Sequence, residues 1–176
     1  THCAIWNGTA TLRWFSRDLN SRGVLVASAL SDSVSEAIIA DRPSRLQPLF
    51  DRAAQDERLF AIGLCSADGR LLQSTGRFPA GLTCAAAVDL AWRGEPRLAL
   101  AGGAVHVGVH EVIGQRPAPP APVALESDGA AQEAPGDAAS TPVAAFEAGA
   151  NRLVPEVVGR LVLVHDMSFV ERRSEE

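Results

Sequence analysis

His106 and His110 are the residues of this chain whose type and spacing first suggest chemistry. They lie in the run A-V-H-V-G-V-H-E-V, which predicts a strand with both imidazoles on one face and the intervening valines facing the core. Four residues of strand span about 13 Å, which is too far for both rings to bind one metal ion unless the strand bends at Gly108. If this strand pairs with the last predicted strand, one ring could meet His165 or Asp166. We predict no metal site; ligand binding, pH sensing and ordinary packing of half-buried histidines stay open.

Cys65 and Cys84 flank a predicted strand–turn–strand unit, and the sequence allows two states for them. In an oxidising compartment they could form a disulfide, which closes a loop of about 20 residues and contributes roughly 3 kcal/mol in the chain-entropy model. In the cytosol they would be two buried thiols. Spacing alone does not decide between these states, because disulfide geometry cannot be deduced from sequence.

The chain lacks the sequence patterns that mark common catalytic sites. It has no P-loop, no G-x-G-x-x-G fingerprint, no H-E-x-x-H pair and no C-x-x-C motif. Nothing in the sequence places a base beside either Cys65 or Cys84, as a thiolate nucleophile would require. We therefore expect no catalytic residue, no cofactor and no enzymatic activity in this stretch of chain.

Composition and charge narrow the class of protein further. The chain has 176 residues, 47% of them hydrophobic, which is enough for one domain with its own core. The net charge of -5 argues against a nucleic-acid partner, which would need a cationic surface. No apolar run reaches the roughly 18 residues that indicate a membrane-spanning helix.

Three helices and five antiparallel strands are predicted to position the candidate residues. The predicted helices span 11–40, 45–57 and 84–92, and the predicted strands span 59–65, 70–74, 97–101, 104–113 and 160–166. In the first helix, two shorter helices broken at Gly23 are the alternative. Asp68-Gly69 predicts a tight turn. Thr83 is expected to cap the third helix and Gly94 to end it.

Two segments differ from the rest of the predicted domain. Residues 115–150 are rich in Pro and Ala and poor in large apolar side chains, which predicts a flexible insertion between adjacent strands. Residues 1–10 lack clear periodicity and are treated as a poorly defined N-terminal segment, so the predicted single domain spans 11–173. After the last strand, a charged and helix-prone tail predicts an exit helix in a domain cut from a longer chain.

Two runs of the sequence resemble a known family of sensor domains. They are F-A-I-G-L-C-S-A-D-G-R-L-L-Q-S (60–74) and L-V-L-V-H-D-M-S-F-V-E-R-R (161–173). The first is similar to the buried strand, Asp-Gly turn and returning strand of extracytoplasmic PAS-like domains of the single-Cache type, and the second to their closing strand before a membrane helix. The resemblance implies an α/β (α+β) fold in which a long N-terminal helix packs on a five-stranded antiparallel sheet.

The same resemblance implies a ligand site and a location. In PAS-like folds the short helix and the sheet face opposite the long helix line the ligand cavity, so Trp92, Arg97, His106 and His110 are the implied ligand-binding residues. Core packing is the alternative for Trp92. The chain lacks the Tyr/Trp/Asp ligand box of amino-acid-binding members, so the resemblance does not name the ligand. It implies the periplasmic face of the inner membrane, with membrane attachment through flanking segments.

Together with W-F-S-R-D-L (14–19), the closing run is similar to the sensor portion of proteobacterial membrane proteins. Their cytoplasmic part resembles a trehalose-6-phosphate synthase-type glycosyltransferase. The expected function is therefore a signal-sensing domain that binds an unknown small molecule and transmits a conformational change to a membrane-linked output. The alternative is a ligand-free structural dimerisation domain of a membrane-anchored enzyme. In either case a homodimer through the N-terminal helix is expected, and exposed Trp14, Val24 and Ile39 would support it.

Overall fold

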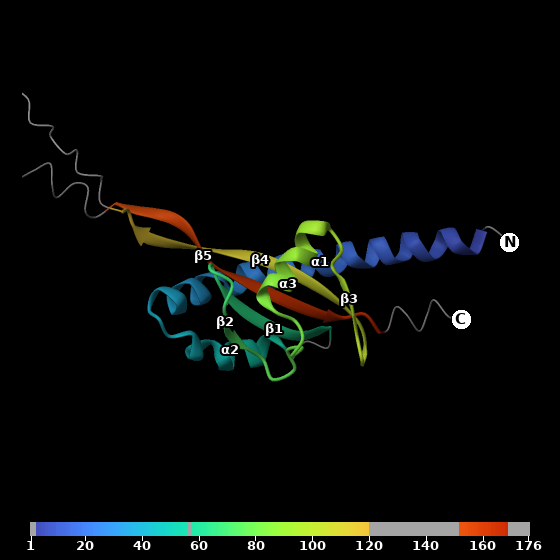
Figure 1. The fold of residues 1–176 in the computed structure, drawn as a ribbon, viewed down its shortest axis with the longest axis horizontal. Helices are drawn as coiled ribbons and strands as arrows, with labels where there is room; N and C mark the ends of the chain where they lie inside the picture. The colour runs from blue at the N-terminus through green and yellow to red at the C-terminus, as the bar shows by residue number, and fades with distance from the viewer. Residues whose placement is uncertain (1–2, 56–57, 120–151, 169–176) are drawn as a thin grey trace, which may run out of the picture. The chain divides into compact units, whose positions relative to one another are not determined.

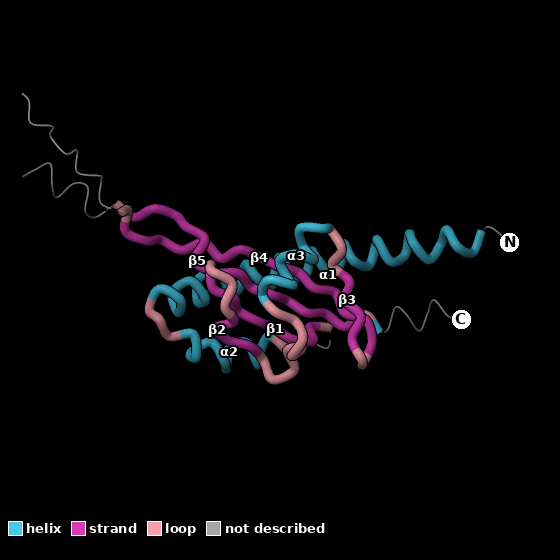
Figure 2. Tube along the Cα trace, in the orientation of Figure 1, coloured by secondary structure: helices cyan, strands magenta, loops and turns pink. Residues whose placement is uncertain are grey.

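The sheet and helices of this protein are seen in a computed structural model that describes residues 3–55, 58–119 and 152–168 (Figure 1). The elements in chain order are α1 (Cys3–Ile39), the 3-10 helix η1 (Pro43–Leu46), α2 (Gln47–Ala53), β1 (Leu59–Ser66), β2 (Leu71–Ser74), α3 (Cys84–Arg93), β3 (Arg97–Leu100), β4 (Gly103–Pro117) and β5 (Leu153–Asp166). The five strands form one antiparallel sheet in the order β2-β1-β5-β4-β3 (Figure 2). A long N-terminal helix packed on a five-stranded antiparallel sheet confirms the predicted α/β class.

The long helix α1 owes its position to a buried stripe at helical spacing. Its buried positions recur every three or four residues along one face, namely Leu19, Gly23, Ala27, Leu30, Val34 and Ala37. From Ala27 onward this face packs on Ile62 and Leu64 of β1 and on Leu161 and Leu163 of β5, together with Phe50 of α2. The 37-residue helix is continuous through Gly23, so the alternative of two helices is wrong. Its start at Cys3 also shows that the predicted start at residue 11 was too late.

The opposite face of the sheet carries α3, which Figure 1 shows in front of the strands with α1 behind them. Its small buried residues Cys84 and Ala87 pack against a second layer of strand residues. That layer consists of Ala61, Cys65, Val105, Val107, Val162 and Val164. The alternation of β4 and β5 therefore supplies one core on each side of the sheet.

Local turn and cap chemistry follows the sequence closely. Gly69 has φ 89° in the turn between β1 and β2, a conformation that a side chain disfavours. The Thr83 hydroxyl accepts a hydrogen bond of 3.1 Å from the Ala86 N–H at the start of α3. Gly94 ends α3 with φ 66°. All three signals were predicted from residue type.

Beyond α1, the element boundaries differ most from the prediction in three places. The expected helix over 45–57 is instead η1 followed by α2, which ends at Ala53. β4 continues to Pro117 and β5 already begins at Leu153, so the predicted insertion started too early and the last strand too late. Residues 120–151, which make up most of the predicted insertion, and the predicted exit helix after Ser168 lie outside the described residues.

The chain divides into two compact units, residues 1–114 with 157–176, and residues 115–156. In the second unit the Ala118 N–H donates a 2.8 Å hydrogen bond to the Arg152 carbonyl, and Arg116 lies 3.7 Å from Glu156. The candidate sites described below belong to the first unit.

Candidate functional site

The sheet separates the four residues that were predicted to bind a ligand together. His106 and His110 lie on the face covered by α1, because the intervening valines belong to the core beneath α3. Arg97 of β3 pairs with His106, so it shares that face. Trp92 lies on α3, on the other side of the sheet. The structure thus places Trp92 at one candidate site and the two histidines at another.

Trp92 is 86% exposed at the last turn of α3, so the alternative of core packing is wrong. It borders two surface grooves of about 370 Å³ and about 360 Å³, called here the Trp92 grooves. Both grooves are lined by Val88, Trp92 and Arg160. The first adds Ala67, Asp68, Gly69, Cys84, Ala85 and Asp89, and the second adds Ala91, Val109 and Glu111.

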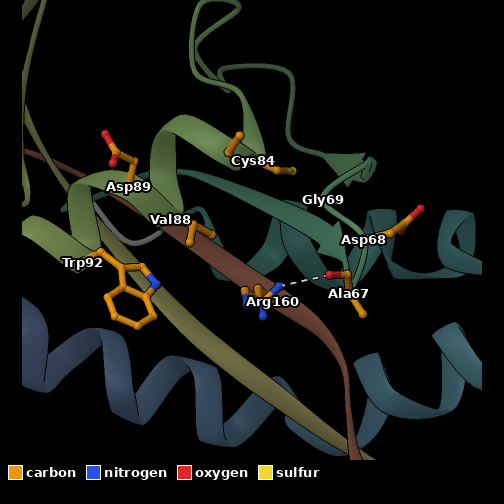
Figure 3. A pocket seen from close by; sticks show the side chains of 9 residues that line it. Ala67, Asp68, Gly69, Cys84, Val88, Asp89, Trp92 and Arg160 are labelled. Carbon is orange, nitrogen blue, oxygen red and sulfur yellow. Dashed lines mark hydrogen bonds between the residues drawn. The ribbon is translucent and has the colours of Figure 1, made fainter.

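Arg160 of β5 is the residue of this site that the sequence analysis missed. Its guanidinium donates a 3.2 Å hydrogen bond to the Ala67 carbonyl (Figure 3). Its Nε also lies 3.8 Å from Glu111. Its side chain is 27% exposed, so the cation is held in place yet still reaches the groove. The signal was its alternation with Val162 and Val164, which places Arg160 on the face that α3 covers.

The carboxylates around the grooves are all paired with arginines. Asp89 lies 2.7 Å from Arg93, and Asp68 accepts a 3.1 Å hydrogen bond from Arg70. The Ser66 hydroxyl also donates to Asp68, and this bond, with the help of Arg70, lowers the pKa of that carboxyl. An exposed indole beside balanced charges suits an uncharged or zwitterionic small molecule with an apolar face.

A disulfide between Cys65 and Cys84 joins β1 to the first residue of α3, with a Cα–Cα distance of 5.9 Å. Of the two states that the sequence left open, the structure therefore has the disulfide. The buried cluster around it occupies the space between α3 and the sheet. The Trp92 grooves lie at the surface beside this cluster, lined by residues of α3, β4, β5 and the turn after β1.

The second candidate site is a layer of imidazoles between α1 and the sheet, called here the histidine cluster (His106, His110 and His165). His106 and His165 are 2% and 3% exposed, and their ring centroids lie 6.0 Å apart. The predicted meeting of a β4 histidine with His165 is thereby confirmed. A Cβ atom added to Gly23 of α1 would lie 2.9 Å from Nε2 of His110, so the missing side chain makes room for this ring.

Burial affects the protonation of two rings of the histidine cluster. It lowers the pKa of His106 and of His110, and repulsion from His110 also lowers the pKa of His106. Nδ1 of His106 and Nε2 of His110 are buried and have no hydrogen-bond partner in the described part of the chain. No group of three His, Cys, Asp or Glu side chains in that part is arranged to hold a metal ion.

Comparison of the chain with known proteins does not assign it to a family. No protein-family model matches the chain, and neither a curated protein nor a solved structure matches it. No helix among the described residues is both long and apolar enough to cross a membrane. The class of protein is therefore defined by the structure itself, as an α/β domain with surface grooves on one face of its sheet and buried histidines on the other.

Proposed function

We propose that this chain is an extracytoplasmic signal-sensing domain that binds a small molecule at the Trp92 grooves and passes a conformational change to a membrane-linked output. The observation that carries the proposal is Trp92 itself, a large aromatic side chain that is 86% exposed beside the positioned cation of Arg160. Aromatic and guanidinium groups that converge on a groove are characteristic of ligand sites.

The route by which a ligand would act runs through β5. Arg160 faces the groove, whereas its neighbour Leu161 is fully buried in the core beneath α1. On the other side of Arg160, a Cβ at Gly159 would lie 2.8 Å from Cδ1 of Ile38 of α1. A shift of Arg160 on ligand binding would therefore move its two neighbours in β5, which pack beneath α1. This supports transmission of the signal through the helix.

The disulfide and the resemblance to single-Cache sensors support the proposed periplasmic location. A bond between Cys65 and Cys84 persists in oxidising compartments and is rare in the cytosol, which favours the periplasmic side of a membrane. The membrane link is proposed from the likeness of residues 161–173 to the closing strand of single-Cache sensors. The output that resembles a glycosyltransferase is proposed from the likeness of this run and residues 14–19 to the sensor portion of proteobacterial membrane proteins.

A ligand screen tests the proposed site directly. We expect a member of a panel of sugars, carboxylates and amines to raise the thermal midpoint of the wild-type domain by mass action. Trp92→Ala should abolish this rise and leave the midpoint without ligand almost unchanged, because the side chain is exposed. Trp14→Ala is the matched control, since Trp14 is also exposed, at 68%, but does not line the grooves. A flat response across the panel, or a rise that survives Trp92→Ala, would contradict the proposal.

A ligand-free dimerisation domain is the second candidate, favoured by the outer face of α1. Trp14, Leu25 and Ile39 are 68%, 71% and 48% exposed, and helical periodicity places them along the same side of α1, opposite the buried stripe. Val24 is exposed beside them at 45%. The expected exposure of Trp14, Val24 and Ile39 is confirmed, and the dimer itself is a proposal.

Oligomeric state tests this alternative. If α1 forms the dimer interface, Leu25→Glu should weaken the dimer at least about tenfold in sedimentation equilibrium, because it places a charge at a desolvated contact. The matched control is Leu71→Glu on β2, where a leucine is 48% exposed away from α1. A wild-type domain that stays monomeric at every concentration, or equal losses in both variants, would exclude dimerisation through this face.

A further inference from the structure

The histidine cluster lies under one short stretch of α1. At one end Leu19 packs with Ala104, two residues before His106, and four residues later Gly23 sits against the ring of His110. Arg22 and Val26 of the same stretch line a pocket of about 200 Å³ together with His165. All three imidazoles are thus located beneath residues 19–26 of the helix.

The contact between α1 and the histidine cluster favours uncharged imidazole rings. His110 occupies the space that the missing side chain of Gly23 leaves, and a glycine at this interior helix position is otherwise unfavourable. Nδ1 of His106 and Nε2 of His110 face surroundings in which neither has a hydrogen-bond partner among the described residues. A proton added to either ring would place a charge in this interface, which is costly where no partner among the described residues compensates it.

The charged groups that face the cluster do not favour its protonation. Near the cluster, Arg22 of α1 and Arg58 before β1 line the pocket with His165, Asp18 of α1 contacts both of these arginines, and Arg97 of β3 lies opposite His106. Oδ2 of Asp18 lies 3.0 Å from Arg22 and 3.8 Å from Arg58, so its charge is already balanced by two cations. Asp18 is thus already engaged by two cations and does not favour a charged imidazole.

We propose that the histidine cluster is a proton-responsive switch, whose neutral rings let α1 dock on the sheet and whose protonation loosens residues 19–26 of the helix. The stimulus would then be acidification of the surroundings, in addition to any ligand at the Trp92 grooves. The loosening itself is independent of the proposed sensing function, and only its passage to an output rests on that function.

The pH dependence has a defined sign. The pKa of His106 and of His110 lies below the ordinary value of 6.5 in the folded state. The unfolded chain therefore binds protons first as the pH falls. The contribution of the two neutral rings to the free energy of unfolding is fully present above pH 6.5. It declines as the pH falls below 6.5 and levels off only below the folded pKa values. Each of the two histidines can lower the folding equilibrium constant by up to about tenfold per pH unit in this range.

Hydrogen exchange and chemical denaturation between pH 7.5 and pH 5 test the switch. In the wild-type domain, protection factors of amides in residues 19–26 should fall with pH before those of Ile62 and Leu64 in β1. A His106→Gln/His110→Gln variant should lose most of this dependence, and each single variant about half of it. Leu71→Gln is the matched control, because Leu71 is exposed on β2 and the variant keeps both histidines, so it should keep the wild-type slope.

Two results would overturn the proposal. One is a double variant that unfolds with the wild-type dependence on pH. The other is observed in the wild-type protein itself, so it decides the question even if the variants fail to fold. If the imidazole resonances of His106 and His110 titrate at or above pH 6.5 in NMR spectra, the rings are not held neutral and the switch does not exist.

Discussion

A Cys65→Ala/Cys84→Ala variant should lose roughly 3 kcal/mol of its free energy of unfolding in urea at pH 7. The disulfide closes a loop with a sequence separation of 19, and its removal restores conformational freedom to the unfolded chain. Both cysteines are buried at 1% and 4% exposure, so the smaller alanines also leave some unfilled volume. The loss should therefore not fall below the loop-closure value.

The control for this prediction uses the same two proteins with a reductant. Reduced wild type should approach the stability of the double variant, whereas the double variant itself should not respond to reductant. Equal stability of variant and oxidised wild type would show that the cross-link contributes nothing, and would remove the main support for a periplasmic location.

Gly159→Ala should destabilise the domain by about 2–3 kcal/mol, near the upper end of the usual cost of overpacking. An added Cβ would lie 2.7 Å from the Cys65 carbonyl oxygen and 2.8 Å from Cδ1 of Ile38. The carbonyl belongs to the backbone of the neighbouring strand, which cannot move aside without disturbing the pairing of β1 with β5. The measurement is again urea denaturation.

Gly76→Ala is the matched control, because nothing lies within 4 Å of its added Cβ and the residue is exposed. This control should change stability by no more than about 1 kcal/mol, and in the stabilising direction if the backbone conformation suits alanine. If Gly159→Ala proved as harmless as Gly76→Ala, the close approach of α1, β1 and β5 would not be as described.

The fold could be predicted from sequence wherever local chemistry and periodicity agreed. Asp68-Gly69, Thr83 and Gly94 each carry a residue-level reason for a turn or cap, and they bound their elements within about two residues. The N-terminal part of β5 was missed because Pro155 and Glu156 resemble the preceding Pro- and Ala-rich stretch. Such a strand is defined by its partner across the sheet and not by its own composition.

The candidate sites were harder to predict, because sequence does not say which face of a sheet a helix covers. Alternation correctly grouped His106 with His110, but it could not show that α1 and not α3 would cover them. For Trp92 a signal was present. Cys84, Ala87 and Leu90 recur every three residues, so they form the inner stripe of α3 and leave Trp92 off that stripe.

The central position of β5 in the sheet affects how the domain folds during synthesis. β1 with β2, and β3 with β4, are two hairpins of neighbouring segments, and β5 lies between them as the last strand in chain order. Until β5 has been synthesised, the hairpins have no strand to join them, and the apolar edge of β1 stays unpaired. Assembly of the sheet thus depends on contacts that are distant in sequence, a topology that generally slows folding.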